Sequence, residues 1–405
     1  MKKNNRVVIT GLGVVSSIGI GWEEFWKNLI AGKSGISKIT SFDASQHDRH
    51  YGGEVKDFDP TQFMSRKKAS SMGRASQMAI AASKLAMRDG GMLTRDLVAS
   101  KTGVSLGTTM GEPQVMERLD TQCFSNGRAL RISDSSAISY PASSISGNVG
   151  FCFNFQGENT VFANACAAGN YTVTRSYDLI KPGKIDIMLA GGVDALSRVA
   201  FTGFGRLFAM APQKCQPFDK SRKGMLLGEG AAVVLLESLQ NAKKRKAKIY
   251  AEILGYGLSC DAHHMTNPSM AGVKKAMRKS IDCAGVDPND IDYISAHGTG
   301  TKENDKTECS AMRTVFGKRT KKIPISSIKS MLGHTMGAAA AFETIACSLA
   351  IDQGIIPPTI NHEQTDPACD IDCVPNKARK TRVHIALNNS QAFGGNNACL
   401  VLGKS

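Results

Sequence analysis

Residues 159–189, NTVFANACAAGNYTVTRSYDLIKPGKIDIML, contain the pattern that decides the fold of this chain. A β-prone run, residues 159–163, leads into Cys166. Residues 169–180 have the composition of a helix, which a Lys-Pro-Gly sequence ends, and the next strand is predicted over residues 185–189. The segment therefore predicts a strand, a sharp turn, a helix and a second strand, which is the repeating unit of an α/β protein.

The same alternation of strands and helices continues toward the C-terminus. Strands are expected at residues 250–254, 291–296, 323–326 and 383–387, with helices at residues 272–284, 306–316 and 337–351. Two β-prone runs that end in G-x-G, at residues 6–13 and 249–257, indicate a duplicated α/β unit. We therefore predict two halves, residues 1–248 and 249–405.

The formal net charge of +15 over 405 residues calls for an acidic partner or a role in solubility. The basic residues form short dispersed runs without interleaved aromatic residues, and no nucleic-acid-binding motif accompanies them. This distribution argues against nucleic acid and favours docking of a small acidic protein.

The 11 cysteines are an odd number and contain no C-x-x-C pair, which favours a reducing, cytoplasmic location. Cys369, Cys373 and His362 are a conceivable set of metal ligands, but unpaired thiols are the favoured interpretation, and no metal is predicted. No apolar run approaches the roughly 20 residues that cross a bilayer, so membrane insertion is not expected.

Cys166 is the candidate nucleophile, because it stands where the strand of residues 159–163 gives way to a helix. A thiolate attacks acyl groups, and the first turn of a helix lowers the pKa of a thiol. The small residues Ala165, Ala167 and Ala168 leave space for a bulky acyl thioester. On this segment alone, a buried core cysteine is the competing interpretation.

Two histidines strengthen the case for a reacting site. His297 begins His-Gly-Thr-Gly-Thr at the end of a predicted strand, and His334 follows Lys329 just ahead of a predicted helix. A late polar and Gly-rich segment, residues 388–397, contains Phe393 as its one large apolar residue. A thiol and two imidazoles at strand ends indicate acyl transfer.

Together these segments resemble the β-ketoacyl-[acyl carrier protein] synthases, the condensing enzymes of the thiolase superfamily. The resemblance extends over nearly the whole chain and includes Ala-Gly-Gly at residues 190–192, Pro-Phe-Asp at 217–219 and Leu-Gly-Glu-Gly at 227–230. It implies a thiolase-like fold, with duplicated α/β halves in a layered αβαβα arrangement.

The resemblance implies a role for each reacting group. Cys166 takes the acyl chain, and His297 and His334 assist decarboxylation of a malonyl thioester, with Lys329 supporting them electrostatically. Backbone N–H groups of Cys166 and Phe393 stabilise the second oxyanion. The reaction is decarboxylative Claisen condensation with malonyl-acyl carrier protein.

It also implies supporting residues and partners. Thr299 and Thr301 contact the phosphopantetheine arm of an acyl carrier protein, and Phe393 acts as a gate. Because the substrates are carried on this arm, no permanently bound cofactor is expected. Further substrate contacts are Phe204, Gly394 and Gly395, and the network residues are Asp305 and Glu308. The residues expected to dock the carrier are Arg66, Lys67, Lys68 and Arg131. The expected assembly is a homodimer, or a heterodimer with a chain-length-factor homologue.

Two other readings compete with the condensing enzyme. A non-catalytic chain-length-factor-like subunit typically lacks the cysteine, which is present here, and a thiolase acting on coenzyme A needs a second cysteine where Phe393 stands. Departures from the family pattern at Asn164, Ala167, Ala168 and Ala392 bear on the acyl chain. They favour slightly a type II polyketide or polyene pathway over fatty-acid elongation, and both remain open.

Overall fold

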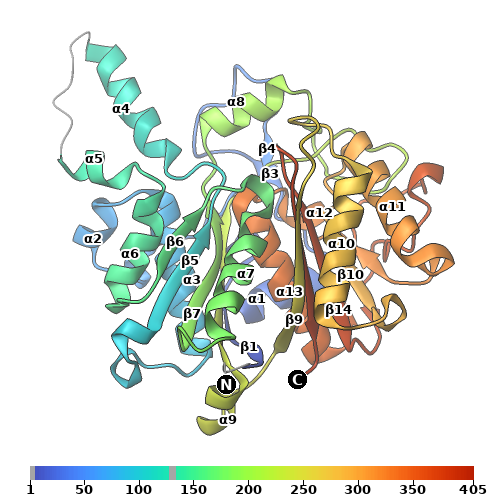
Figure 1. The fold of residues 1–405 in the computed structure, drawn as a ribbon. Coiled ribbons are helices and arrows are strands. Elements are labelled where there is room, and N and C mark those ends of the chain that lie inside the picture. The colour runs from blue at the N-terminus through green and yellow to red at the C-terminus, as the bar shows by residue number, and fades with distance from the viewer. Residues whose placement is uncertain (1–4, 127–133) are drawn as a thin grey trace.

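The computed structural model describes residues 5–126 and 134–405, and it places a large mixed sheet at the centre of the molecule (Figure 1). The strand order is β11-β10-β14-β15-β9-β1-β8-β7-β5-β6, with β2 paired to β1. The strands and helices of the first part of the chain are β1 (Val7–Ser16), β2 (Gly19–Ile20), α1 (Trp22–Ile30), β3 (Ser37–Lys38), β4 (Tyr51–Gly52), α2 (Arg66–Ser70), α3 (Arg74–Asp89), β5 (Thr102–Gly107), α4 (Pro113–Asn126), α5 (Asp134–Ser139), α6 (Ser143–Phe153), β6 (Asn159–Phe162), α7 (Ala168–Ile180), β7 (Ile187–Asp194), α8 (Arg198–Arg206), β8 (Gly230–Ser238) and α9 (Leu239–Lys244).

The second part of the chain repeats this alternation. Its strands and helices are β9 (Ala251–Cys260), α10 (Met270–Ala284), β10 (Tyr293–Ser295), α11 (Lys302–Phe316), β11 (Ile325–Ser326), α12 (Lys329–Leu332), α13 (Ala339–Gln353), β12 (Ile355–Ile356), β13 (Arg379–Lys380), β14 (Ile385–Gln391) and β15 (Asn396–Gly403).

The two parts of the sheet have the same topology. The order β6-β5-β7-β8-β1 matches β11-β10-β14-β15-β9, and in each set the first three strands are parallel while the last two pairings are antiparallel. The predicted duplication of an α/β unit is therefore confirmed. We propose residue 248, in the segment that joins α9 to β9, as the boundary between the halves.

Helices α7 and α13 form the inner layer of the fold. Helix α7 packs on β5 and β7 but also contacts β15, and α13 packs on β14 and also contacts β8. Helices α3 and α6 cover the outer face of the first half-sheet, and α10 covers that of the second (Figure 1). This is the predicted αβαβα arrangement. Residues 339–351 of α13 are all buried, and this part of the helix is accordingly apolar on nearly every side.

Matching sharp turns lead into the two inner helices. Ala165 (φ 47°) and Met336 (φ 51°) both occupy the left-handed region, and each begins a 3-10 turn, Ala165–Ala167 or Met336–Ala338. Such backbone is strained for residues with a Cβ, and it persists where the surrounding structure fixes it. The turns bring the segments before α7 and α13 together at the centre of the molecule.

The chemistry of glycine explains where the predicted and observed strands differ. Helix α7 begins one residue before its predicted start, whereas β7 continues past residue 189, its predicted end, through Gly191 and Gly192 to Asp194. A Cβ on Gly192 would lie 2.3 Å from the carbonyl oxygen of Gly337, so this strand can pass the turn before α13 only without a side chain.

The first prediction concerns the contact between the inner helices. A Cβ on Gly169 would lie 2.6 Å from the backbone nitrogen of Ala341. We expect Gly169→Ala to lower the free energy of unfolding by about 1–3 kcal/mol, because two backbones must separate. Chemical denaturation measures this change. The control is Gly203→Ala in α8, where a Cβ meets nothing within 4 Å; it should leave stability unchanged or raise it by up to about 1 kcal/mol. Equal effects of the two variants would contradict the prediction.

Candidate active site

A cavity of about 430 Å³ brings together the predicted reacting groups from both halves of the chain. Cys166, His297, His334 and Phe393 all line it. Its wall also includes four residues that the sequence analysis connected with substrate, Phe204, Thr299, Thr301 and Gly395, whereas Gly394 is not part of the lining. Residues more than 200 positions apart in the sequence, such as Cys166 and Phe393, thus line one cavity.

Cys166 lies in the 3-10 turn just before α7, at the predicted junction of strand and helix. Burial raises the pKa of its thiol to about 12, although Lys329 and the backbone N–H groups of Phe393 and Cys166 act in the opposite direction. The N–H group at the helix start does lower the pKa of this thiol, as expected, but desolvation has the larger effect, so the net shift is upward. The same two N–H groups are the ones predicted to hold the oxyanion.

The two imidazoles are neutral hydrogen-bond donors. Burial, followed by the charge of Lys329, lowers the pKa of both His297 and His334 well below 6.5. The Nδ1 atom of His334 accepts from the backbone N–H of Met336 (3.1 Å), and Nδ1 of His297 lies 3.5 Å from Lys329 Nζ. Each ring therefore carries its proton on Nε2. The ring centroids are 5.4 Å apart, so both donors serve one site.

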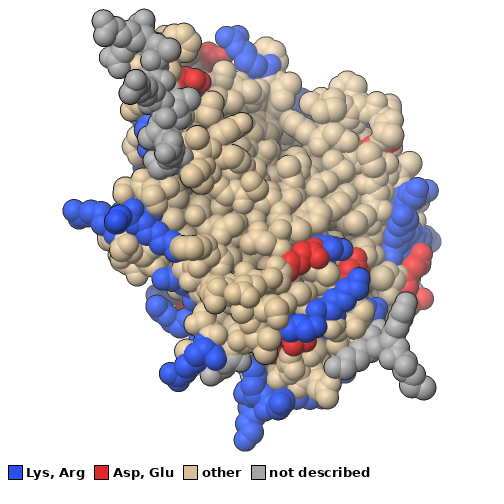
Figure 2. Space-filling view, turned by 60° about the vertical axis from the view of Figure 1, so that its left-hand side comes forward, with Lys and Arg blue, Asp and Glu red and all other residues tan. Residues whose placement is uncertain are grey.

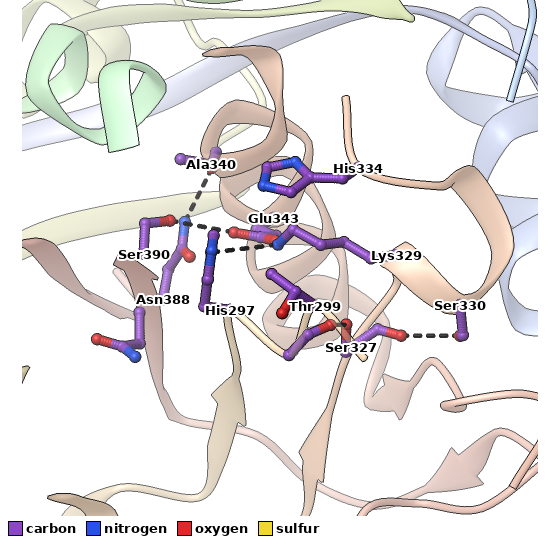
Figure 3. A network of polar contacts seen from close by, with 12 residues as sticks. His297, Thr299, Ser327, Lys329, Ser330, His334, Ala340, Glu343, Asn388 and Ser390 are labelled. Atoms are coloured by element: carbon purple, nitrogen blue, oxygen red, sulfur yellow. Dashed lines mark hydrogen bonds and ion pairs between the residues drawn. The ribbon is translucent and has the colours of Figure 1, made fainter. Parts of the chain in front are cut away.

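A buried ion pair joins Lys329 to Glu343 of α13, and Figure 3 shows Lys329 reaching toward both Glu343 and His297, with His334 beside them. Ser390 also donates to Glu343, at 3.2 Å. Burial raises the pKa of Glu343 to about 7 in spite of the lysine. The sequence analysis missed Glu343. The sequence feature that could have revealed it is a single carboxylate in an otherwise apolar segment of a predicted helix. A carboxylate that is buried in this way requires a charged partner.

The predicted network residues hold the His297 loop rather than the substrate. Glu308 accepts from the backbone N–H groups of His297 (2.7 Å) and Gly298 (2.8 Å). Asp305 accepts from Gly300 and lies 3.5 Å from the guanidinium of Arg222. Both carboxylates are fully buried and outside the cavity lining. They fix the direction in which the loop between β10 and α11 turns toward the cavity.

Phe393 closes one side of the cavity. Its ring stacks on that of Phe204 of α8, with centroids 5.6 Å apart and an interplanar angle of 30°. Thr299 and Thr301 also line the cavity, and their hydroxyl groups bond to each other (2.9 Å). The residue predicted as a gate and those predicted to contact the arm therefore line the same cavity as Cys166.

The predicted docking residues lie elsewhere on the surface. Arg66, Lys67 and Lys68 are in α2 and take no part in the cavity lining, and Lys68 lies over the ring of Phe151, 5.4 Å from its centroid. Arg131 is outside the described residues. The cations at the cavity itself are Arg222, Lys223 and Lys302, which the sequence analysis did not single out.

The thiols considered as metal ligands lie in the apolar core of the second half. Cys369 and Cys373 are buried thiols that pack in one apolar cluster with Cys309. Within residues 5–126 and 134–405, no group of three or more His, Cys, Asp or Glu side chains is arranged to hold a metal ion. In the same ranges no helix has the length and apolar character that crossing a membrane requires.

Comparison with known sequences assigns the family. The family described as Beta-ketoacyl synthase, N-terminal domain, matches residues 4–242, and the corresponding C-terminal domain matches residues 250–363. The chain belongs to the beta-ketoacyl synthase family. It is thus a ketosynthase, an acyltransferase of the thiolase superfamily, as its sequence motifs predicted. Two curated relatives are the 3-oxoacyl-[acyl-carrier-protein] synthases 2 of Synechocystis sp. (38% identity) and Coxiella burnetii (39%), each covering 99% of both chains.

Solved ketosynthase structures confirm the thiolase-like fold. A chain of the ishigamide ketosynthase/chain length factor is 46% identical, with a TM-score of 0.97 over 99% of this chain and 100% of the other. A chain from a complex of a type II polyketide synthase acyl-carrier protein with its hexaketide-bound ketosynthase is 31% identical, with a TM-score of 0.92 over the same shares.

The second prediction follows from the electrostatics of the ketosynthase site. Because Lys329 lowers the pKa of both histidines, we expect Lys329→Met combined with Glu343→Gln to raise these pKa values. The acid limb of the pH–rate profile for malonyl decarboxylation then moves to higher pH, since more imidazole is protonated at a given pH. Replacing both partners avoids leaving a buried unpaired charge, which costs about 3–5 kcal/mol.

Lys223→Met is the control for this measurement, because Lys223 also lines the cavity but is not among the charges that lower the pKa of either histidine. The acid limb of this variant should stay at the wild-type position. If the double variant has the same acid limb as Lys223→Met, the assigned influence of Lys329 is contradicted.

Proposed function

We propose that this ketosynthase accepts an acyl chain on Cys166 and condenses it with a malonyl group carried by an acyl carrier protein. The observation that supports this best is the shared cavity, in which one thiol faces two neutral imidazoles that each present an Nε2–H donor. The product is a 3-oxoacyl-carrier lengthened by two carbons.

In the first half-reaction the thioester carbonyl of the incoming chain is attacked by Cys166. The bond from the acyl carbon to the arm sulfur breaks, a new bond to the Cys166 sulfur forms, and the thiol proton passes to the departing arm thiol. The thiol enters this step protonated because burial raises its pKa. A neutral imidazole within the cavity is the group able to relay that proton.

In the second half-reaction the carbon–carbon bond of the malonyl group breaks and CO₂ leaves. The electron pair forms an enolate, whose thioester oxygen accepts hydrogen bonds from the Nε2–H groups of His297 and His334. The enolate carbon attacks the acyl-Cys166 carbonyl, and the oxyanion there is held by the backbone N–H groups of Cys166 and Phe393. Collapse of this intermediate breaks the bond to the Cys166 sulfur, which leaves as a thiolate and takes up a proton from water. Burial, with the charge of Lys329, favours the neutral form of both imidazoles in this half-reaction.

The variant Cys166→Ala separates the two half-reactions. We expect it to abolish acyl transfer and elongation and to retain malonyl decarboxylation, because the imidazole donors remain. Mass spectrometry of the products and CO₂ release measure the two activities. Cys283→Ala, which changes an exposed thiol of α10, is the matched control and should elongate normally. Elongation by Cys166→Ala would overturn the proposal.

An acyl carrier protein delivers the substrates in this proposal, as the carrier bound to its ketosynthase in the type II polyketide synthase complex suggests. The arm reaches Cys166 past Thr299 and Thr301, which line the cavity. Arg66, Lys67, Lys68 and Arg131 remain the proposed docking residues for an acidic carrier, and we place the enzyme in the cytoplasm. A non-catalytic chain-length-factor role is not favoured, because the reacting groups are assembled.

A second thiolase-like chain is proposed to pair with the edge of the sheet at β6. In the part of the chain that the structure describes, this strand pairs with β5 alone. Large apolar side chains are exposed on the adjoining helices, namely Phe124, Ile138 and Phe151. Figure 2 brings this side forward, and the middle of the face shows a broad area without charged residues. Unpaired edges and broad uncharged faces are typical of subunit interfaces.

The 46% identical chain comes from a ketosynthase/chain length factor structure. That relationship supports a heterodimer with a chain-length-factor homologue, and with it a type II polyketide or polyene pathway. A homodimer in fatty-acid elongation is the second candidate. Co-purification of this chain with a cysteine-lacking homologue distinguishes the two assemblies.

The proposed pairing at β6 depends on the outward-facing backbone groups of this strand. The carbonyls of Glu158 and Phe162 accept from β5, so by alternation the backbone groups of Val161 face outward. We expect Val161→Pro to remove an outward N–H and to convert the dimer to a monomer, as measured by light scattering. Val161→Thr keeps that N–H and should remain dimeric. A dimeric proline variant would contradict β6 pairing.

A further inference from the structure

Gln391 is a buried polar residue that the proposed mechanism does not use. It ends β14, lines the reaction cavity and is 3% exposed. Neither its Nε2 nor its Oε1 atom has a hydrogen-bond partner among the residues that the structure describes. A buried amide without partners destabilises a fold, and such groups are rare enough that each calls for an explanation.

Strand alternation gives the direction of this side chain. Ser390 bonds to Glu343 in the inner layer, whereas Asn389 donates to Glu308 of α11 on the outer face of the sheet. Gln391 shares the outer face with Asn389, because side chains two residues apart in a strand point the same way. It therefore faces the side of the cavity on which the loop before α11 lies, rather than the inner helices.

The polar neighbours of Gln391 are already committed to other partners. Asn397 is its cross-strand partner in β15, and the Asn397 amide donates to Asp261 (2.7 Å) and Ser259 (3.3 Å). Thr299 and Thr301 bond to each other. None of these side chains forms a hydrogen bond with the Gln391 amide.

Packing does not account for an amide at this position. In the duplicated fold β7 corresponds to β14, and the outer-face side chain near the end of β7 is Val193, buried in an apolar cluster with residues of α3. The fold accommodates an apolar side chain there in its first half. A glutamine in the second half, next to the reaction cavity, points to recognition of a ligand.

We propose that the Gln391 carboxamide recognises a secondary amide of the arm that carries the acyl or malonyl group. Its Nε2 donates to the carbonyl of that amide, and its Oε1 accepts from the N–H. A carboxamide has a donor side and an acceptor side, and a secondary amide offers the complement of both, whereas a carboxylate or thioester carbonyl only accepts. This assignment rests on the proposed function, and it makes Gln391 a specificity-determining residue for pantetheine-type thioesters.

The test compares Gln391→Met with wild type on two thioesters of one acyl chain. The first is a pantetheine thioester, which contains two secondary amides, and the second is an alkyl thioester of similar length that contains none. Single-turnover acylation of Cys166 is followed by mass spectrometry. The variant keeps the length of the side chain and removes a polar group without partners, so the fold should be retained. Gln62→Met, at an exposed position outside the cavity, is the matched control.

We expect Gln391→Met to acylate about tenfold more slowly from the pantetheine thioester and at the wild-type rate from the alkyl thioester. Gln62→Met should match wild type on both. An equal loss on the two thioesters would show a purely structural role, and no loss on either would show that the amide is not recognised; both results overturn the inference. If wild-type Cys166 is acylated by neither thioester, the proposed function itself fails.

Discussion

The close contact between the starts of α7 and α13 is the constraint on which the rest of this structure depends. Gly169 allows the backbone of α7 to meet Ala341 of α13, and each helix begins with a strained turn, at Ala165 and at Met336. Because both turns lie at the centre, Cys166 and the segment containing the second histidine face one cavity. A duplicated fold thereby builds one asymmetric site from two equivalent helix starts.

Burial determines the electrostatics of that site. It raises the pKa of Cys166 and lowers the pKa of His297, so in the resting enzyme the thiol and the imidazole are both neutral. Of the buried charged groups, Lys329 and Glu343 form an ion pair beside His297 and compensate each other. A neutral site suits a reaction whose negative charge appears first on an enolate and then on an oxyanion, since fixed N–H donors stabilise both without reorganising.

Much of this architecture could be predicted from local patterns, and the exceptions have physical reasons. The turn at Cys166 and the helix after it follow from β-prone, small and helix-forming residues in sequence order. Strand β7 was predicted too short, because glycine is a turn signal unless another backbone passes close by, as it does at Gly192. Glu343 and Gln391 were missed, since neither a charge in an apolar helix nor an amide at a strand end has a partner that sequence spacing reveals.

The sequence by itself determined the order of strands and helices, the duplicated α/β class and the identity of the reacting thiol and imidazoles, because these depend on residue type and local spacing. Only the tertiary structure decided their protonation, the tautomers of His297 and His334 and the ion pair of Lys329. Those properties depend on desolvation and on distances between segments far apart in the chain, and both arise when the two halves pack around their inner helices.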